Sequence, residues 1–106
     1  MVVGASKAAL ESLTRYLAVE FSPMNIVVNA VSPGVVETDA LKHFDSMRKA
    51  ENLIGKTAKA TPAGRLVTPE EVAGVVSFLA SPAAAMIRGQ VITVDGGFLL
   101  EIKNRE

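Results

Sequence analysis

Several kinds of residue are scarce or absent in this sequence. The 106 residues include no cysteine, no tryptophan, one tyrosine and four phenylalanines. Without cysteine the chain has no disulfide and no thiolate metal ligand, and nothing requires an oxidising compartment, so we expect a cytoplasmic protein. The shortage of aromatic side chains predicts a core of alanine, valine, leucine and isoleucine.

Charge of one sign and long apolar runs are also lacking. Eleven basic residues balance eleven acidic ones, so charge gives no reason to expect nucleic acid or an anionic membrane surface as a partner. No apolar run reaches the roughly 20 residues of a membrane helix, and no signal peptide is recognisable. The length suits one domain of modest size.

Two long helices are predicted. Apolar residues recur at three- and four-residue steps from Ala5 to Phe21, and Ser22-Pro23 ends the run. A second helix begins at Thr68, which forms a capping box with Glu71, and ends at Ser81-Pro82. The predicted core faces are Ala9, Leu10, Leu13, Leu17 and Phe21 in the first helix, and Val72, Val75, Val76 and Leu79 in the second.

Two short strands alternate with these helices. The segments 25–31 (NIVVNAV) and 90–94 (QVITV) are rich in β-branched residues, and Asp95-Gly96-Gly97 forms a turn after the second. Residues 35–66 are charged and irregular in apolar spacing, which predicts one or two short, mobile helices. The order indicates an α/β unit with two parallel strands, an open sheet edge and a polar tail at 98–106.

The motifs SKAAL, VVNAVSPGVVET, TPAGR, TPEEVAGVVSFLAS and RGQVITVDGG resemble the C-terminal part of the short-chain dehydrogenase/reductase family. The resemblance runs from about Gly4 to about Gly97. Within the family, SKAALESLTRYLAVE, TDALKHF and MIRGQ are most similar to the bacterial NADPH-dependent enoyl-acyl-carrier-protein reductases III. This implies a Rossmann-type, doubly wound parallel sheet, of which residues 1–106 form one partial domain with two strands, two long helices and a short-helix lid.

The resemblance also implies what the chain does not contain. No glycine-rich turn that would hold a pyrophosphate is found in it, and the catalytic serine of the family is missing too. Val3 stands where most members have the catalytic tyrosine, and the enoyl reductase branch would place that tyrosine before Met1. Tyr16 cannot replace it, because it lies about 180° around the helix from Lys7. We therefore expect a fragment that is inactive alone.

Lys7 matches the lysine that, in the family, hydrogen-bonds the cofactor ribose and lowers the pKa of the tyrosine. From spacing alone it is a solvent-exposed lysine at a helix start. Pro33, Gly34 and Thr38 match residues that line the nicotinamide pocket, and the implied cofactor is NADPH, with NADH as the alternative. From local pattern alone, Pro33-Gly34 is a strand-ending turn and Thr38 a helix cap. Residues 39–60 match the substrate lid loop.

The remaining polar residues receive structural interpretations. Asn29 is predicted to be a hydrogen-bonded amide, and His43 a surface residue without the partners that a metal site needs. Arg65 and Arg88 are predicted to stabilise turns or an interface. No metal site is expected.

The resemblance implies an oxidoreductase that reduces the carbon–carbon double bond of an acyl thioester in fatty-acid biosynthesis. It also implies a homo-oligomer, a tetramer in the family. Two alternatives stay open. The chain is a non-catalytic oligomerisation module or remnant, or it belongs to a 3-ketoacyl or sugar dehydrogenase of the same family.

Overall fold

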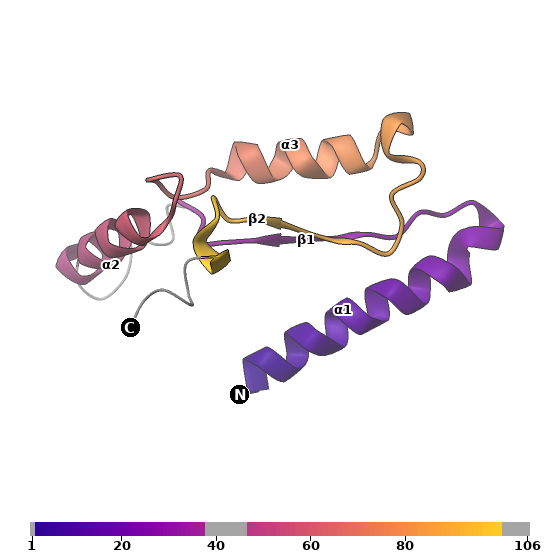
Figure 1. Ribbon diagram of the computed structural model, residues 1–106, viewed down its shortest axis with the longest axis horizontal. Helices are drawn as coiled ribbons and strands as arrows, with labels where there is room; N and C mark the ends of the chain where they lie inside the picture. Colours follow the sequence, from indigo (N-terminus) through magenta and orange to yellow (C-terminus); the bar gives the residue numbers. More distant parts are fainter. Residues whose placement is uncertain (1, 38–46, 101–106) are drawn as a thin grey trace. The chain divides into compact units, whose positions relative to one another are not determined.

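The computed structural model describes residues 2–37 and 47–100. Along the chain, its regular elements are the helix α1 (Val2–Phe21), a 3-10 turn (Ser22–Met24), the strand β1 (Ala30–Pro33), the helices α2 (Met47–Ala60) and α3 (Pro69–Leu79), a second 3-10 turn (Pro82–Ala84) and the strand β2 (Val91–Val94) (Figure 1). The chain divides into two compact units, which we describe separately. Unit 1 comprises Met1–Ser32 and Val75–Ile92, and unit 2 comprises Pro33–Gly74 and Thr93–Glu106.

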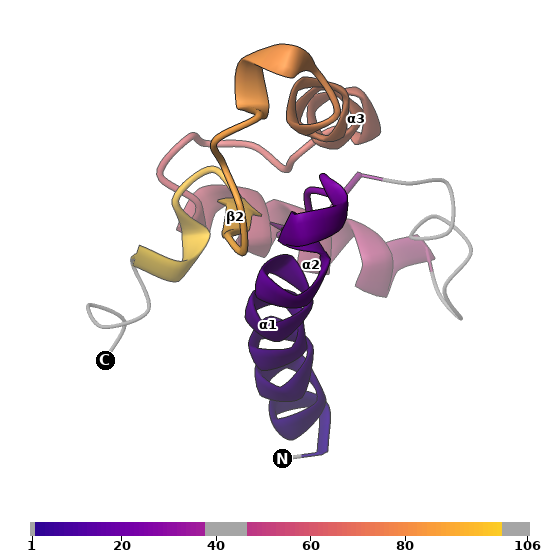
Figure 2. The ribbon, with the colours of Figure 1, turned by 90° about the vertical axis from the view of Figure 1, so that its right-hand side faces the viewer.

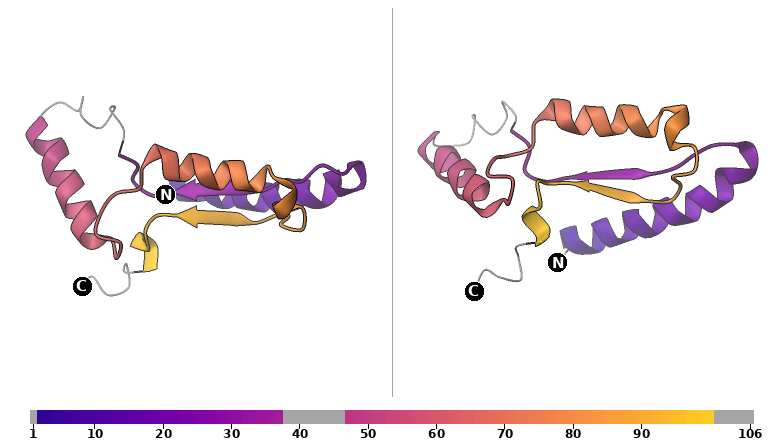
Figure 3. Two further views of the ribbon diagram at one scale, coloured as in Figure 1. Left: turned by 90° about the horizontal axis from the view of Figure 1, so that it is seen from above. Right: turned by 45° about the horizontal axis from the view of Figure 1, so that its top comes forward.

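The two strands pair in a two-stranded parallel sheet, as predicted. The Ala30 N–H donates to the Gln90 carbonyl at 2.9 Å, and the Gly34 N–H donates to the Val94 carbonyl at 3.0 Å. The residue numbers of the two partners rise together, which is the register of parallel strands. Both arrows point the same way in each view of Figure 3.

The bounds of β2 agree with the prediction to within one residue, but those of β1 do not. The predicted strand began at Asn25, whereas β1 begins at Ala30. Asn25 has a left-handed backbone, with φ of 58°, and its N–H donates to the Ser22 carbonyl to close the turn after α1. The β-branched run 25–31 therefore begins within the turn that ends the first helix, and periodicity alone did not reveal this.

The helix α1 is confirmed, but of its predicted core face only Leu17 and Phe21 are half-buried, and the rest is exposed. Its buried residues are Thr14 and Ala18, each 5% exposed, while Leu10 and Leu13 are 59% and 49% exposed. A Cβ added to Gly89 would lie 3.3 Å from the Ala18 Cβ. The helix α1 therefore packs against the segment before β2 through two small residues, Ala18 and Gly89. Among the described residues, the leucines on the neighbouring face have no covering partner.

The helix α3 begins at Pro69, as the capping box predicted. Of its predicted core face, Val72, Val75 and Leu79 are half-buried, but Val76 is 51% exposed. Within unit 1, α1 and the last turn of α3 lie on opposite sides of the strands (Figures 1 and 2). The arrangement is helix, sheet, helix, with a sheet of two strands.

One or two short, mobile helices are predicted for residues 35–66, and the described part of this region contains one, α2, whose predicted mobility stays a prediction. This helix has 14 residues, and Ile54, Thr57 and Ala58 form its half-buried side. These positions follow helical spacing, but two of them are threonine and alanine. The sequence did not reveal this half-buried side, because large apolar side chains do not make it up.

The buried apolar residues of the described chain are few and mostly small. They are Ala18 and Ala84 in unit 1, and Leu66 and Val67 in unit 2. The expected aliphatic core is therefore only partly assembled, and large apolar side chains such as Tyr16 and Val19 are 67% and 77% exposed. Much apolar surface of the described residues is therefore open.

Candidate active site

The candidate cofactor residues Pro33 and Gly34 lie in unit 2, where β1 ends. Asp95 follows β2 directly and lies beside them. In parallel sheets covered by helices, ligands bind outside the carboxyl ends of the strands. The sequence therefore places its proline-glycine pair at the edge of the sheet where a cofactor would be expected.

Gly34 has a packing role that the sequence did not show. A Cβ on this residue would lie 2.8 Å from the Asp95 Cβ and 3.1 Å from the Asp95 Cα. Atoms attached to backbone cannot move away cheaply, so only glycine lets the ends of β1 and β2 come this close. β1 ends at Pro33, as predicted, but Gly34 is still paired with Val94 and the bend comes one residue later, at Val35, so the predicted turn at Pro33-Gly34 is wrong in position.

Asp95 holds the turn that follows β2. It is 9% exposed, its Oδ1 accepts the Gly97 N–H at 2.8 Å, and its Oδ2 accepts the Leu99 N–H at 3.0 Å. Gly96 and Gly97 have φ values of 66° and 92°, as the predicted turn requires. The carboxylate's role was not predicted, although an aspartate before two glycines is a known signal for such a turn.

An open pocket of about 540 Å³ lies against this turn. It is lined by residues 93–97, Leu99 and Leu100. Val94 and the two leucines give it apolar walls, and the backbone around Asp95 forms its polar side. The pocket adjoins the end of β2, and neither Pro33 nor Gly34 is among its lining residues.

Arg65 stabilises the start of α3. Its Nη1 and Nη2 donate to Glu71 Oε1 and Oε2, both at 2.7 Å, and Nη1 also donates to the Leu66 carbonyl at 3.2 Å. These bonds, together with the backbone bond from Thr68, lower the pKa of Glu71 to about 2, and the same pair raises the pKa of Arg65. The turn-stabilising role predicted for Arg65 is confirmed.

The predicted capping box is also present. The Glu71 N–H donates to Thr68 Oγ1 at 3.2 Å, and the Thr68 N–H donates to Glu71 Oε1 at 2.9 Å. Glu71 thus serves the helix cap and the ion pair together. The sequence indicated the first function but not the second, because Arg65 lies outside the helix.

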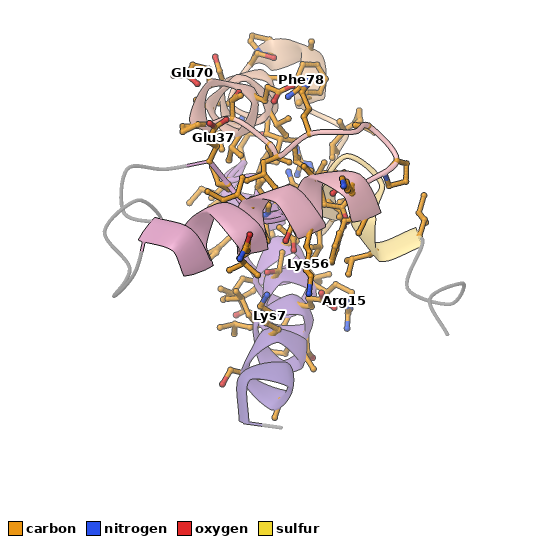
Figure 4. The ribbon with its side chains drawn as sticks, turned by 90° about the vertical axis from the view of Figure 1, so that its left-hand side faces the viewer. Lys7, Arg15, Glu37, Lys56, Glu70 and Phe78 are labelled. Carbon is orange, nitrogen blue, oxygen red and sulfur yellow. The ribbon has the colours of Figure 1, made fainter. Side chains whose placement is uncertain are left out.

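Lys7 lies near the start of α1, in unit 1, with an exposed side chain (Figure 4). Among the described residues no side chain forms an ion pair with it. Its ammonium group is thus open to an oxygen ligand, and its three N–H donors suit the hydroxyls of a ribose. The assignment of Lys7 to a nicotinamide site stays a prediction.

The other polar predictions for unit 1 are confirmed. Asn29 donates through Nδ2 to the Ile87 carbonyl at 2.7 Å, and its Oδ1 accepts the Gln90 N–H at 3.0 Å, so the amide is satisfied. Arg88 donates to the Ala85 carbonyl at 3.0 Å and to Ser22 Oγ at 3.1 Å. Both side chains stabilise the connection to β2.

Some predictions lie outside the described residues. They concern Thr38, His43 and the first part of the lid loop, 39–46. In the described ranges, no cluster of three histidine, aspartate or glutamate side chains has the geometry of a metal site. No helix in residues 2–37 or 47–100 has the length and apolar character to cross a membrane.

Comparison with known proteins identifies the family. A family model described as enoyl-(acyl carrier protein) reductase matches residues 1–99. The chain belongs to the short-chain dehydrogenase/reductase family. The predicted resemblance is confirmed at this level, and so is the Rossmann-type fold. Members of this family are oxidoreductases that use NAD(P)H.

Two relatives and one solved structure illustrate the match. The chain is 41% identical over 97 residues to a tropinone reductase homolog of Arabidopsis thaliana, covering 92% of this chain and 36% of that protein. It is 45% identical over 92 residues to a 3-oxoacyl-[acyl-carrier-protein] reductase of Aquifex aeolicus, covering 87% and 35%. An oxidoreductase of the family from Burkholderia thailandensis matches with a TM-score of 0.81 and 35% identity, covering 91% and 37%. The chain therefore spans little more than a third of these relatives.

Proposed function

We propose that this chain supplies the lysine and the nicotinamide loop of a reductase that acts on an acyl thioester, with enoyl-acyl-carrier-protein reduction in fatty-acid biosynthesis as its reaction. One observation carries the proposal: the family model that bears this description spans residues 1–99. The Aquifex relative, whose name also specifies an acyl-carrier-protein substrate, supports the thioester class.

Each candidate residue has a distinct role in this proposal. Lys7 holds the ribose hydroxyls and places a positive charge beside the tyrosine of the active site, which favours the phenolate. Pro33 ends β1, Gly34 after it has no side chain to block the approach of a planar ring, and Thr38 adds a hydroxyl donor. The nicotinamide, when bound, supplies the hydride. We assign NADPH as the cofactor from the resemblance to the enoyl reductase branch, and NADH remains the alternative.

The lid is the second part of the proposal. Residues 39–60 would cover the acyl chain, and α2 supports this with an amphipathic character, since Ile54, Thr57 and Ala58 are half-buried while Leu53 and Lys56 are exposed. Closing such a lid excludes water from the reacting atoms. The absence of cysteine is compatible with a cytoplasmic enzyme, and we propose that location.

A chimera tests this function. Residues 4–97 replace the matching segment of the Aquifex 3-oxoacyl reductase, and turnover is measured with enoyl and 3-oxoacyl thioesters of one chain length. We expect enoyl reduction to rise above that of the host enzyme. Lys7→Ala should lower kcat by about 100-fold or more, whereas Glu70→Ala, at an exposed position on α3 outside the proposed site and lid, should change it by less than about two-fold.

The outcomes separate the parts of the proposal. Turnover of the 3-oxoacyl substrate alone would favour the 3-ketoacyl alternative, and unchanged activity of Lys7→Ala would remove the lysine from the catalytic site. The isolated chain is expected to show no turnover. Steady NADPH oxidation by the purified 106-residue protein with a short enoyl thioester would contradict that expectation.

A second candidate function, a non-catalytic assembly module, is favoured by the surface of α1. Leu10, Leu13, Tyr16 and Val19 are between 49% and 77% exposed on a helix whose buried residues are Thr14 and Ala18. Exposed apolar groups of this kind commonly mark protein interfaces. We propose a homo-oligomer formed through α1. Light scattering after size exclusion would show it, Tyr16→Ser should weaken it, and a monomer at high concentration would contradict it.

A further inference from the structure

The two ends of the segment that contains α2 meet at one point in unit 2. Val36 and Val67 form a parallel bridge, and the Glu37 N–H donates to the Val67 carbonyl at 2.9 Å. The chain leaves after Glu37 and returns through α2 to Thr61, which is buried. Val67 therefore forms the base of this segment, and its position fixes the backbone at Glu37.

Val67 is held through the residues on either side of it. The preceding carbonyl, that of Leu66, accepts a bond from Arg65 Nη1 at 3.2 Å. The following N–H, that of Thr68, donates to Glu71 Oε1 at 2.9 Å. Arg65 and Glu71 join in two parallel bonds of 2.7 Å, so one bidentate ion pair fixes both peptide groups that flank Val67.

Stability alone does not account for this arrangement. The side chains of Arg65 and Glu71 are 59% and 41% exposed. Ion pairs that are this accessible to water contribute little to the free energy of unfolding, because solvent screens them. A planar guanidinium that binds both oxygens of a carboxylate does, however, fix the orientation of the two side chains. A lysine ammonium cannot do so, because it is a single point charge on a flexible stem.

We infer that Arg65 is a positioning residue for the loop 34–37, acting through Glu71 and Val67. It touches neither Gly34 nor Glu37 itself. It fixes the Val67 carbonyl, to which the Glu37 N–H is bonded, and Gly34 lies three residues before Glu37 at the end of β1. The functional importance of this loop rests on the proposed cofactor role of Pro33, Gly34 and Thr38, but the mechanical link itself does not.

Amide hydrogen exchange of the full chain tests the link. The Glu37 N–H reports the bond to Val67, and the Gly34 N–H, bonded to the Val94 carbonyl at 3.0 Å, is a reference in the same unit. In Arg65→Ala we expect exchange at Glu37 to accelerate about two- to five-fold, the range for an exposed ion pair. Exchange at Gly34 should stay within the error of the measurement.

Two further variants keep the test decisive if Arg65→Ala folds poorly. Arg65→Lys keeps the charge but lacks the two-pronged contact, so it should restore only part of the protection at Glu37. Glu71→Gln removes the charge and keeps one acceptor for Thr68, and it should also accelerate Glu37. Unchanged exchange at Glu37, or equal acceleration at Glu37 and Gly34, would overturn the inference, because equal acceleration signals general destabilisation.

The chimera described above gives an independent readout. Arg65→Ala there should raise the KM for the nicotinamide cofactor more than it lowers kcat, since the loop would be displaced rather than chemically altered. A chimera that is inactive in every form would count against the proposed function only. The exchange result in the full chain would still support or overturn the role of Arg65.

Discussion

The helix α1 and the segment Thr61–Thr68 differ in how they are held. The helix has 20 residues, and from Gly4 onward, where burial is described, only Thr14 and Ala18 are buried, although leucines follow its length. The segment is much shorter, yet Thr61, Leu66 and Val67 are each 5–6% exposed. The segment also bonds to the loop before it, to the turn after β2 and to α3. In these two regions, residues are therefore buried where the backbone is hydrogen-bonded to neighbouring segments, and a high content of apolar residues does not by itself predict burial.

The largest effect is expected where backbone contacts are closest. Gly34→Ala places a Cβ 2.8 Å from that of Asp95, and we expect it to lower the free energy of unfolding by about 3 kcal/mol, the upper end of overpacking costs. Gly74→Ala is the matched control, because nothing lies within 4 Å of its added Cβ. In the middle of α3 it should stabilise by about 0.5–1 kcal/mol. Urea unfolding followed by circular dichroism measures both, and equal midpoints would contradict the packing account.

A smaller effect is expected on α1. Ala18→Leu forces a larger side chain against Gly89 and should cost about 2 kcal/mol. Leu13→Gln should change stability by less than about 0.5 kcal/mol, because Leu13 is 49% exposed. A cost of about 2–5 kcal/mol for truncating Leu13 to alanine would instead restore the core face predicted from periodicity. Thermal unfolding at low protein concentration separates these results from association.

The cap of α3 is expected to have a lesser effect. Thr68→Ala removes the acceptor for the Glu71 N–H and should cost about 1 kcal/mol. Thr68→Ser retains the hydroxyl and should behave like the wild type. The midpoint of urea unfolding is again the measurement, and equal losses in both variants would show that the methyl group, and not the cap, matters.

The smallest effect concerns pH. The pKa of Glu71 is lowered from 4.5 to about 2, so its carboxylate stabilises the fold above pH 4.5 and loses this contribution as the pH falls towards 2. A carboxyl carbon titration by NMR should give a midpoint near 2, and Arg65→Ala should move it up towards 4.5. An unchanged midpoint in that variant would mean that the Thr68 bonds, and not Arg65, hold the pKa down.

The predictions from sequence succeeded where the signal is local and polar. Thr68, Glu71 and Pro69 specify a helix start within a few residues, and Asp95-Gly96-Gly97 specifies a turn, so these features could be located to the residue. Parallel pairing of the strands also followed from their apolar composition and the helix between them. The family motifs also supplied the candidate site residues, whose roles stay predictions.

The predictions failed where the answer depends on what covers a surface. Leu10 and Leu13 have the spacing of a core face, but spacing cannot show whether a partner is present. The half-buried side of α2 includes Thr57 and Ala58, so it does not register as apolar. The contact of Gly34 with Asp95 joins residues far apart in the chain, and no local pattern contains it.

The bridge between Val36 and Val67 has a consequence for how such a chain can vary. It holds the two ends of the intervening segment together, so the length of that segment affects stability mainly through the entropic cost of closing a loop. That entropy grows slowly, and doubling the length of a flexible loop costs only about 0.6 kcal/mol. Insertions and deletions between Glu37 and Thr61 are therefore inexpensive, while changes within Thr61–Thr68 are not. A family built on this plan can diversify one surface freely and keep its folding unchanged.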